Sequence, residues 1–298
     1  MMKNQYVCDI GDFGKYALLR VFAEAGIKIG VNWYLTEDDG STDGKYKDYL
    51  QKGDLRHYSQ DLFDELKKIV ERKEKTVFDI EKAHIIPGAC YYSDILKPIG
   101  NPAERIEWRR KWFEKCMELL NDSDLIFADP DNGLLQSDVA SDKNAEKYVL
   151  PGEVEEMFRA GKNVVYYCHK GRRKENAWRE YLSIMFERIK DAKPAVLTYH
   201  KGTQRSYVFL IHKKDYKRYR KIIDGFLSRW YRLFSEEFTS KGDVAREING
   251  EAFVVKRKDG VEITIEKRAD GRIQTKSSAE PNTTRIIDVE WFCNRIGY

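Results

Sequence analysis

The segment Leu125-Ile126-Phe127-Ala128-Asp129-Pro130-Asp131-Asn132-Gly133 joins a short apolar run to a polar turn. Residues 125–128 predict a buried strand. Pro130 fixes the backbone after that strand and removes a hydrogen-bond donor, and Gly133 permits a sharp turn away. In a parallel α/β sheet, ligands bind where strands end at their carboxyl edge. We therefore predict that residues 129–133 form the active site.

Predicted strands and helices alternate on both sides of this segment. The expected strands are residues 27–35, 76–80, 124–129, 163–168, 195–199 and 207–212. The expected helices begin with residues 12–25 and 62–70 and continue with 104–120, 152–160, 173–189 and 215–234. This alternation predicts a three-layer α/β/α fold with a mostly parallel sheet. Because only residues 201–206 separate the last two strands, one of these strands is expected to be antiparallel.

The chain changes character after Phe238. Asp259-Gly260 and Asp270-Gly271 lie between alternating segments, which is the pattern of short β-hairpin turns. We predict an α/β catalytic domain over residues 1–238 and a small antiparallel β-meander appendage over residues 239–298.

Composition narrows the class of protein. The 298 residues are 42% hydrophobic and 34% charged, a globular balance, and no stretch has the roughly 20 apolar residues of a membrane span. The N-terminus lacks the apolar run of a signal peptide, so we expect a cytoplasmic protein without membrane partners. Five scattered cysteines without CxxC spacing predict neither a disulfide framework nor a zinc site.

Charge is distributed unevenly along the chain. Residues 1–150 hold 22 Lys and Arg against 28 Asp and Glu, a net charge of −6. Residues 168–222 hold 16 against 5, a net charge of +11. A basic face beside an acidic centre suits an enzyme that holds a polyanion over carboxylates, and the alternative is a solvated basic helix. Lys213, Lys214, Lys217 and Arg218 are the candidates for contacts to a nucleic-acid backbone.

The candidate catalytic residues gather at predicted strand ends. Asp129 is expected to be the principal acid or base, with Asp131 and Asn132 orienting water or substrate. The alternative is a turn in which these side chains cap the next helix. His169-Lys170-Gly171 and His200-Lys201-Gly202 each follow a predicted strand, and we expect His169 and His200 to attend a leaving group. Lys170, Lys201, Gln204 and Arg205 supply phosphate-binding side chains.

Two further segments offer substrate contacts. Asp9, Asp12 and Lys15 precede or begin a helix, where an anion, a metal or sugar hydroxyls can bind; the simpler interpretation is that Asp12 caps the helix. Trp33 and Tyr34 could stack on an extruded base, although such aromatic residues are more often part of a core.

Residues 129–132 resemble the Asp-Pro-Pro-aromatic motif of amino-methyltransferases that act on nucleic acids. Residues 13–19 resemble the cofactor-side helix of those enzymes, and the turn at 201–206 suits their sheet. The resemblance implies an S-adenosylmethionine cofactor. Asp131 and Asn132 depart from the motif, and residues 31–35 lack the glycine-rich turn that holds this cofactor.

The same segment also resembles the uracil-DNA-glycosylase superfamily, in which an apolar strand ends in a segment containing Asp-Pro. A later strand of that superfamily ends in a loop containing His, which residues 167–171 or 199–202 could match. This resemblance implies hydrolysis of a base–sugar bond without a cofactor. An enzyme of phage defence that removes modified cytosine would be one member of this class.

We therefore expect a hydrolase that acts on a base of a nucleic acid, with DNA favoured, after base flipping and without a cofactor or metal. The second hypothesis is a methyltransferase with an aberrant cofactor site. The third is a non-catalytic nucleic-acid-binding protein.

Overall fold

The computed structural model describes residues 3–38, 40, 46–72, 75–97, 99–141, 143–237, 253–256, 262–267 and 273–287. The chain divides into two compact units. One comprises Met1–Trp178 with Ile184–Glu237, and the other comprises Arg179–Ser183 with Phe238–Tyr298.

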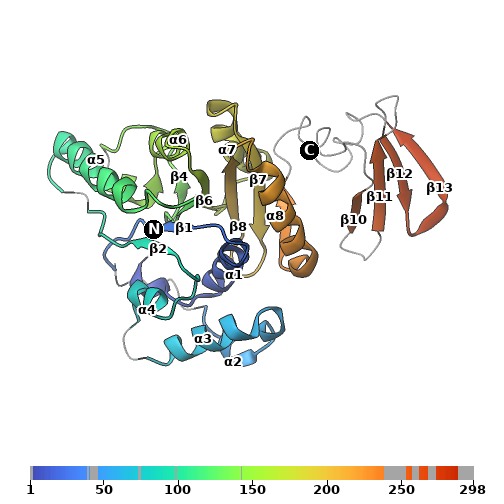
Figure 1. Ribbon diagram of the computed structural model, residues 1–298, viewed down its shortest axis with the longest axis horizontal. Coiled ribbons are helices and arrows are strands. Elements are labelled where there is room, and N and C mark those ends of the chain that lie inside the picture. Colours follow the sequence, from blue (N-terminus) through green and yellow to red (C-terminus); the bar gives the residue numbers. More distant parts are fainter. Residues whose placement is uncertain are drawn as a thin grey trace. The chain divides into compact units, whose positions relative to one another are not determined.

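A seven-stranded sheet forms the centre of the first unit, with the strand order β2-β1-β3-β6-β8-β7-β9 (Figure 1). In chain order its strands are β1 (Ile29–Asn32), β2 (Cys90–Tyr92), β3 (Leu125–Ala128), β6 (Asn163–His169), β7 (Lys193–Tyr199), β8 (Arg205–Ile211) and β9 (Phe234–Glu237). The first four strands in spatial order are parallel. Strand β8 is antiparallel to both β6 and β7, and β9 is antiparallel to β7. The predicted α/β fold with one reversed strand in the final pair is confirmed.

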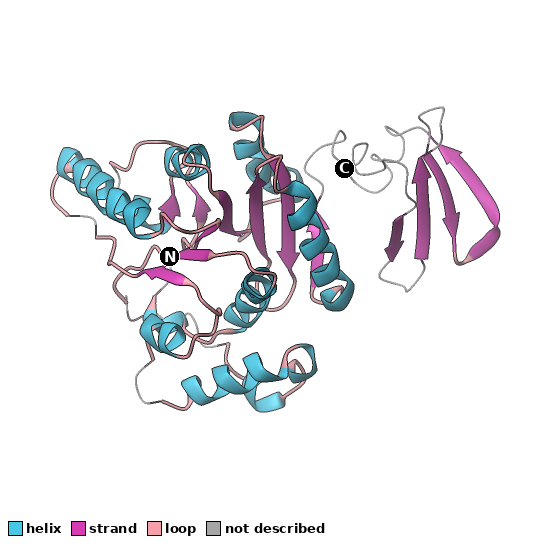
Figure 2. Ribbon diagram, in the orientation of Figure 1, coloured by secondary structure: helices cyan, strands magenta, loops and turns pink. Residues whose placement is uncertain are grey.

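Helices cover both faces of this sheet (Figure 2). They are α1 (Ile10–Glu24), α2 (Tyr49–Lys52), α3 (Gln60–Val70), α4 (Val77–Lys82), α5 (Pro102–Leu119), α6 (Pro151–Arg159), α7 (Glu175–Arg188) and α8 (Tyr216–Trp230). Alternate strand residues such as Phe127, Val165 and Phe209 share one core with α1, α3 and α8. Helix α5 and helix α6 lie on the opposite side (Figure 1). Because strand side chains alternate between faces, both faces bury apolar residues, as parallel strands require.

One expected element is wrong, and another ends earlier than expected. Residues 76–80 were expected to form a strand but belong to helix α4, because Thr76 and Asp79 form a capping box that starts a helix there. The outer strand β2 is instead Cys90–Tyr92. The helix expected over 215–234 ends at Trp230, and Phe234 begins β9.

The second unit contains a four-stranded antiparallel sheet. Its strands are β10 (Phe253–Lys256), β11 (Glu262–Lys267), β12 (Ile273–Ser277) and β13 (Glu280–Ile287), paired in chain order. The expected meander is therefore present, but both Asp-Gly turns lie outside the described residues. No described helix is long and apolar enough to cross a membrane.

A buried ion pair fixes the chain where β1 ends. Arg109 on α5 donates to both carboxylate oxygens of Glu153 on α6, at 2.7 and 2.8 Å. Glu153 also accepts a hydrogen bond from the Tyr34 hydroxyl at 3.0 Å. Tyr34 has a positive φ of 45°, which is uncommon for a residue other than glycine. The pair therefore holds Tyr34 in an unfavourable backbone conformation directly after β1.

Replacing Glu153 with Gln should strongly destabilise the first unit. The variant leaves the Arg109 guanidinium buried without its counter-charge, and breaking a buried pair in this way costs about 3–5 kcal/mol. The measurement is the free energy of unfolding in urea.

The matched control is Glu107→Gln on the exposed face of α5, where Glu107 pairs with Arg110 and Lys111. This control should leave the unfolding midpoint nearly unchanged. Equal losses in the two variants would contradict a stabilising role for the buried pair.

Candidate active site

A pocket of about 340 Å³ lies at the edge of the sheet where β3 and β6 end and β8 begins. The N-terminal part of α1 forms another side of it. The lining residues are Tyr6, Asp9, Gly11, Asp12, Lys15, Tyr46, Asp129, Pro130, Asp131, Asn132, Tyr167, His169, Thr203, Arg205 and Tyr207. The carboxyl edge of the parallel strands thus carries the pocket, as the Asp-Pro segment predicted.

The strand register places the innermost residues of the pocket side by side on neighbouring strands. Ala128 on β3 pairs with Tyr166 on β6, so the next residue, Asp129, stands level with Tyr167. Tyr167 in turn pairs with Tyr207 on β8. The rings of Tyr167 and Tyr207 meet edge to face, with centroids 6.1 Å apart. A carboxylate and two aromatic rings therefore form the innermost part of this sheet edge.

Lys15 connects α1 to β3 inside the pocket. Its ammonium lies 2.7 Å from Asp12 Oδ1 and 2.7 Å from Asp129 Oδ2, and all three side chains are buried. Burial alone would lower the pKa of Lys15, but the two carboxylates outweigh it and raise that pKa. Burial also raises the pKa of the Asp129 carboxyl, an effect that Lys15 opposes. The three charges are tolerated inside the protein because the ammonium pairs with both carboxylates.

Asp9 and Arg205 form a second connection between α1 and the sheet. Asp9 caps α1 by accepting a hydrogen bond from the Asp12 backbone at 3.0 Å, so the expected cap at Asp12 is wrong. The other Asp9 oxygen accepts from Arg205 at 3.2 Å. Gly11 lies beside this pair, and a Cβ there would be 2.5 Å from the Arg205 guanidinium carbon, so a larger residue would have to displace the Arg205 side chain. The start of α1 is thus occupied by the protein's own carboxylate and is not an open anion site.

His169 lies at the rim with an altered proton affinity. Burial lowers the pKa of its imidazole, and the positive charges of Arg205 and Arg173 lower it further. The ring is therefore neutral near pH 7. Its Nδ1 is 3.5 Å from the Tyr167 hydroxyl. Burial raises the pKa of Tyr167 to about 12, so this hydroxyl keeps its proton.

Asp131 and Asn132 form the mouth of the pocket beyond Pro130. The Asn132 backbone donates to the Lys147 carbonyl at 3.0 Å, and Gly133 turns the chain with a φ of 104°. Residues Gly133–Leu134 (β4) then pair with Tyr148–Val149 (β5). The side chains of Asp131 and Asn132 are half-buried, so they can contact both a ligand and solvent.

Eight of the expected site residues line the pocket: Asp9, Asp12, Lys15, Asp129, Asp131, Asn132, His169 and Arg205. His200 lies outside it, because β8 separates β7 from β6 and the His200 ring meets Ser235 Oγ at 2.8 Å. Lys170 and Gln204 contact each other beside the pocket, and Lys201 is exposed beside a second, smaller hollow.

Trp33 and Tyr34 also lie outside the pocket and are fully buried. Trp33 stacks on Tyr91 and donates to Glu81 at 3.0 Å. The expected stacking on a base is therefore wrong for both residues, and their alternative interpretation as core residues holds.

The basic residues near the start of α8 lie at the opposite edge of the sheet from the pocket. Strand β8 runs away from Arg205, and its seven residues span roughly 20 Å before Lys213 and Lys214. The expectation that they share a surface with the active site is wrong.

Four tyrosines line the pocket without having been expected as site residues from the sequence: Tyr6, Tyr46, Tyr167 and Tyr207. Tyr167 and Tyr207 occupy alternating positions of apolar strands, so the sequence pattern presents them as core residues. Their position at a strand end is the signal that could have identified them.

Comparison with models of known protein families and with characterised proteins finds no match to the chain. Within the described part of the chain, no three His, Cys, Asp or Glu side chains are arranged to hold a metal ion. Any function must therefore be inferred from the pocket itself.

Replacing Lys15 with Met should destabilise the protein in a pH-dependent way. At pH 7.5 the variant buries two carboxylates without their cation, which should cost about 3–5 kcal/mol. Burial raises the pKa of Asp129 and Lys15 opposes that rise, so without Lys15 the carboxyl protonates at a higher pH than it does in wild type. The deficit relative to wild type should therefore shrink at pH 5.

Urea unfolding of both proteins at the two pH values measures this deficit. Lys68→Met, at an exposed lysine that pairs with Glu65, is the control and should behave like wild type at both. A deficit that stays constant with pH would contradict the ionic role of Lys15.

Proposed function

We propose that the protein hydrolyses the base–sugar bond of a nucleotide in a nucleic acid, with DNA favoured, and leaves an abasic site. The observation that carries this proposal is the charge of the pocket. Four carboxylates line it, those of Asp9, Asp12, Asp129 and Asp131, against two cations, Lys15 and Arg205. Counted with all four carboxylates ionised and His169 neutral, the lining carries a formal net charge of −2.

A negative pocket favours a reaction in which positive charge develops. When a base–sugar bond breaks, its electron pair goes to the base nitrogen and the sugar becomes a cation. Buried carboxylates stabilise that cation more strongly than they would in water, because the surroundings screen charge less. Asp129 is the carboxylate held deepest at the strand end, where Lys15 fixes its position.

The remaining lining groups suit the attack of water on the sugar. His169, being neutral, can take a proton from water whose oxygen bonds to the sugar carbon. Asp131 and Asn132, at the mouth, can orient that water through their carboxylate and amide groups. The tyrosine rings provide flat apolar walls for a base that has left its stack.

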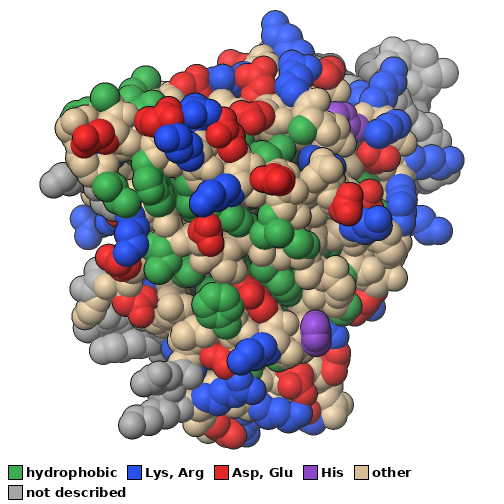
Figure 3. All heavy atoms as spheres, turned by 60° about the vertical axis from the view of Figure 1, so that its left-hand side comes forward, with side chains coloured by type: hydrophobic (Ala, Val, Ile, Leu, Met, Phe, Trp, Pro, Cys, Tyr) green, Lys and Arg blue, Asp and Glu red, His purple; other side chains and the backbone are tan. Residues whose placement is uncertain are grey.

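Exposed basic residues stand on the loops that follow β6 and β7, next to the pocket: Arg172, Lys174 and Lys201. These loops suit contacts to phosphates outside a negative pocket. By contrast, Lys and Arg are interspersed with Asp and Glu on the face shown in Figure 3. We therefore assign the phosphate contacts to the two loops.

Methyl transfer is the second candidate function, and the packing of α1 favours it. Helix α1 places Lys15 on Asp129, and β8 is reversed, in keeping with the resemblance to amino-methyltransferases. The residues after β1 do not fit S-adenosylmethionine, because Trp33 and Tyr34 fill that space and are anchored to Glu81 and Glu153. We therefore rank this candidate below hydrolysis.

Replacing Asp129 with Asn tests the hydrolytic role. Asn keeps the size of the side chain and removes its charge, and Lys15 retains Asp12 as a partner, so folding should survive. Turnover should fall on the order of 10²-fold or more, as expected when a positioned acid–base or charged group is lost. The measurement is alkali-labile breaks at abasic sites in DNA that carries normal, deaminated and bulky modified bases.

The two His-Lys-Gly segments provide a matched control. His169→Gln should lower turnover strongly, whereas His200→Gln should retain nearly the wild-type rate because His200 lies outside the pocket. Wild-type protein that forms no abasic site but transfers a labelled methyl group would reject hydrolysis in favour of the second candidate.

Salt dependence tests where phosphates bind. Replacing Arg172 and Lys201 with Gln should reduce the slope of log K against log salt by about 0.9 per lost contact in duplex DNA. Replacing Lys213 and Lys214 with Gln, at the opposite edge, should leave the slope unchanged. The reverse result would move the nucleic acid away from the pocket.

A further inference from the structure

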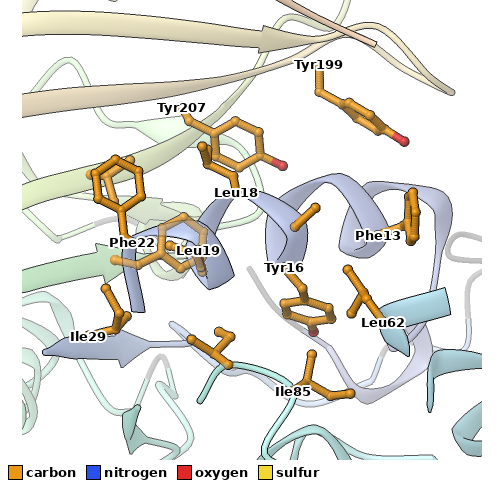
Figure 4. Packing of buried hydrophobic residues seen from close by; sticks show 14 of the residues in the cluster. Phe13, Tyr16, Leu18, Leu19, Phe22, Ile29, Leu62, Ile85, Tyr199 and Tyr207 are labelled. Carbon is orange, nitrogen blue, oxygen red and sulfur yellow. The ribbon is translucent and has the colours of Figure 1, made fainter. Parts of the chain in front are cut away.

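Tyr207 carries a buried hydroxyl that lacks a hydrogen-bond partner. The side chain is 1% exposed, and its hydroxyl makes no hydrogen bond within the described structure. Tyr207 projects from β8 toward α1 (Figure 4) and lines the pocket. An unsatisfied buried polar group costs about 1–3 kcal/mol, so a ligand or water that satisfies it is expected.

Other polar groups deep in the pocket already have partners. Lys15 is bound by Asp12 and Asp129, and Arg205 is bound by Asp9. The Tyr167 hydroxyl lies near His169 Nδ1. The Tyr207 hydroxyl therefore still needs a partner, and it is buried at the wall of the pocket, where a bound ligand can supply one. Burial raises its pKa well above the ordinary value, so it keeps its proton and can donate.

The chemistry of the rest of the pocket limits what that ligand can be. The excess of carboxylates disfavours an anionic group and favours a ligand that donates hydrogen bonds, since an ionised carboxylate only accepts. The rings of Tyr167 and Tyr207 favour a flat ligand. A nucleobase with an exocyclic amino group satisfies both conditions, because it donates from the amino group and accepts at a ring nitrogen or carbonyl oxygen.

We propose that Tyr207 donates a hydrogen bond to the bound base while Asp131 accepts one from its exocyclic amino group, so that the pocket selects amino-bearing bases over their oxo counterparts. This inference rests on the proposed function only in taking the ligand to be a nucleobase, and it does not require that the base–sugar bond is hydrolysed. An oxo base turns a carbonyl oxygen toward the carboxylate, which leaves two acceptors facing each other.

Nucleoside binding tests the selectivity without any turnover. Calorimetry of the wild-type protein compares the affinity for deoxycytidine with that for deoxyuridine, and the affinity for deoxyadenosine with that for deoxyinosine. Within each pair, the first nucleoside has an exocyclic amino group where the second has an oxo group. In at least one pair the amino nucleoside should bind about tenfold more tightly. Equal affinity within both pairs, tighter binding of the oxo nucleosides, or no binding of any of them at millimolar concentration would overturn the proposal.

Tyr207→Phe tests the donor, with Tyr166→Phe as its matched control. Tyr166 is the residue before Tyr167 on β6, is also fully buried with an unpartnered hydroxyl, and does not line the pocket. Both variants should keep or raise the melting temperature, because each removes an unsatisfied polar group. Only Tyr207→Phe should weaken binding of the amino nucleoside, by roughly tenfold.

Unchanged affinity in Tyr207→Phe, or an equal loss in Tyr166→Phe, would overturn the role of Tyr207. The outcomes separate this inference from the proposed function. If wild-type protein forms no abasic sites but shows amino selectivity that depends on Tyr207, hydrolysis fails and the recognition of the base stands.

Discussion

The Lys15 ammonium, held between the carboxylates of Asp12 and Asp129, is the interaction on which the rest of the site depends. It joins the start of α1 to the end of β3 across 114 residues of sequence. Three charges are buried together, and none of them would be tolerated there alone. The pairing therefore sets the distance between the helix and the strand end, and the pocket lies where these two elements meet.

The pocket has an excess of carboxylates, although the whole chain has a positive net charge. The chain carries a net charge of +4, whereas four carboxylates and two cations line the pocket. Further basic side chains, those of Arg172, Lys174 and Lys201, are exposed on the neighbouring loops. Under the proposed function, the phosphates of a nucleic acid contact these loops, while the pocket receives an uncharged base and stabilises positive charge on its sugar.

After β1, the structure departs from what the resemblance to amino-methyltransferases implies. Trp33 and Tyr34 follow β1 and are fixed by Glu81 and by the Arg109–Glu153 pair. Large anchored side chains thus occupy the region in which the resemblance implies a glycine-rich turn. The pocket lies toward β6 and β8 and draws none of its lining from residues 32–36.

The sequence by itself determined the fold class, because apolar runs and helical periods are local properties that survive in any arrangement of the elements. It also located the edge of the sheet that carries the pocket, since an apolar run that ends in Asp129-Pro130 marks a strand end. The strand expected at residues 76–80 was wrong, because the capping box of Thr76 and Asp79 starts a helix there. His169 and His200 each begin a His-Lys-Gly tripeptide, so the sequence does not distinguish them. The tertiary structure shows that only His169 lines the pocket, because the reversed strand β8 lies between the strands that carry the two residues. The tertiary structure alone revealed Tyr207 as a pocket residue and Lys15 as the partner of Asp129. Strand register and helix packing set such contacts between distant segments, and they leave no local pattern in the sequence.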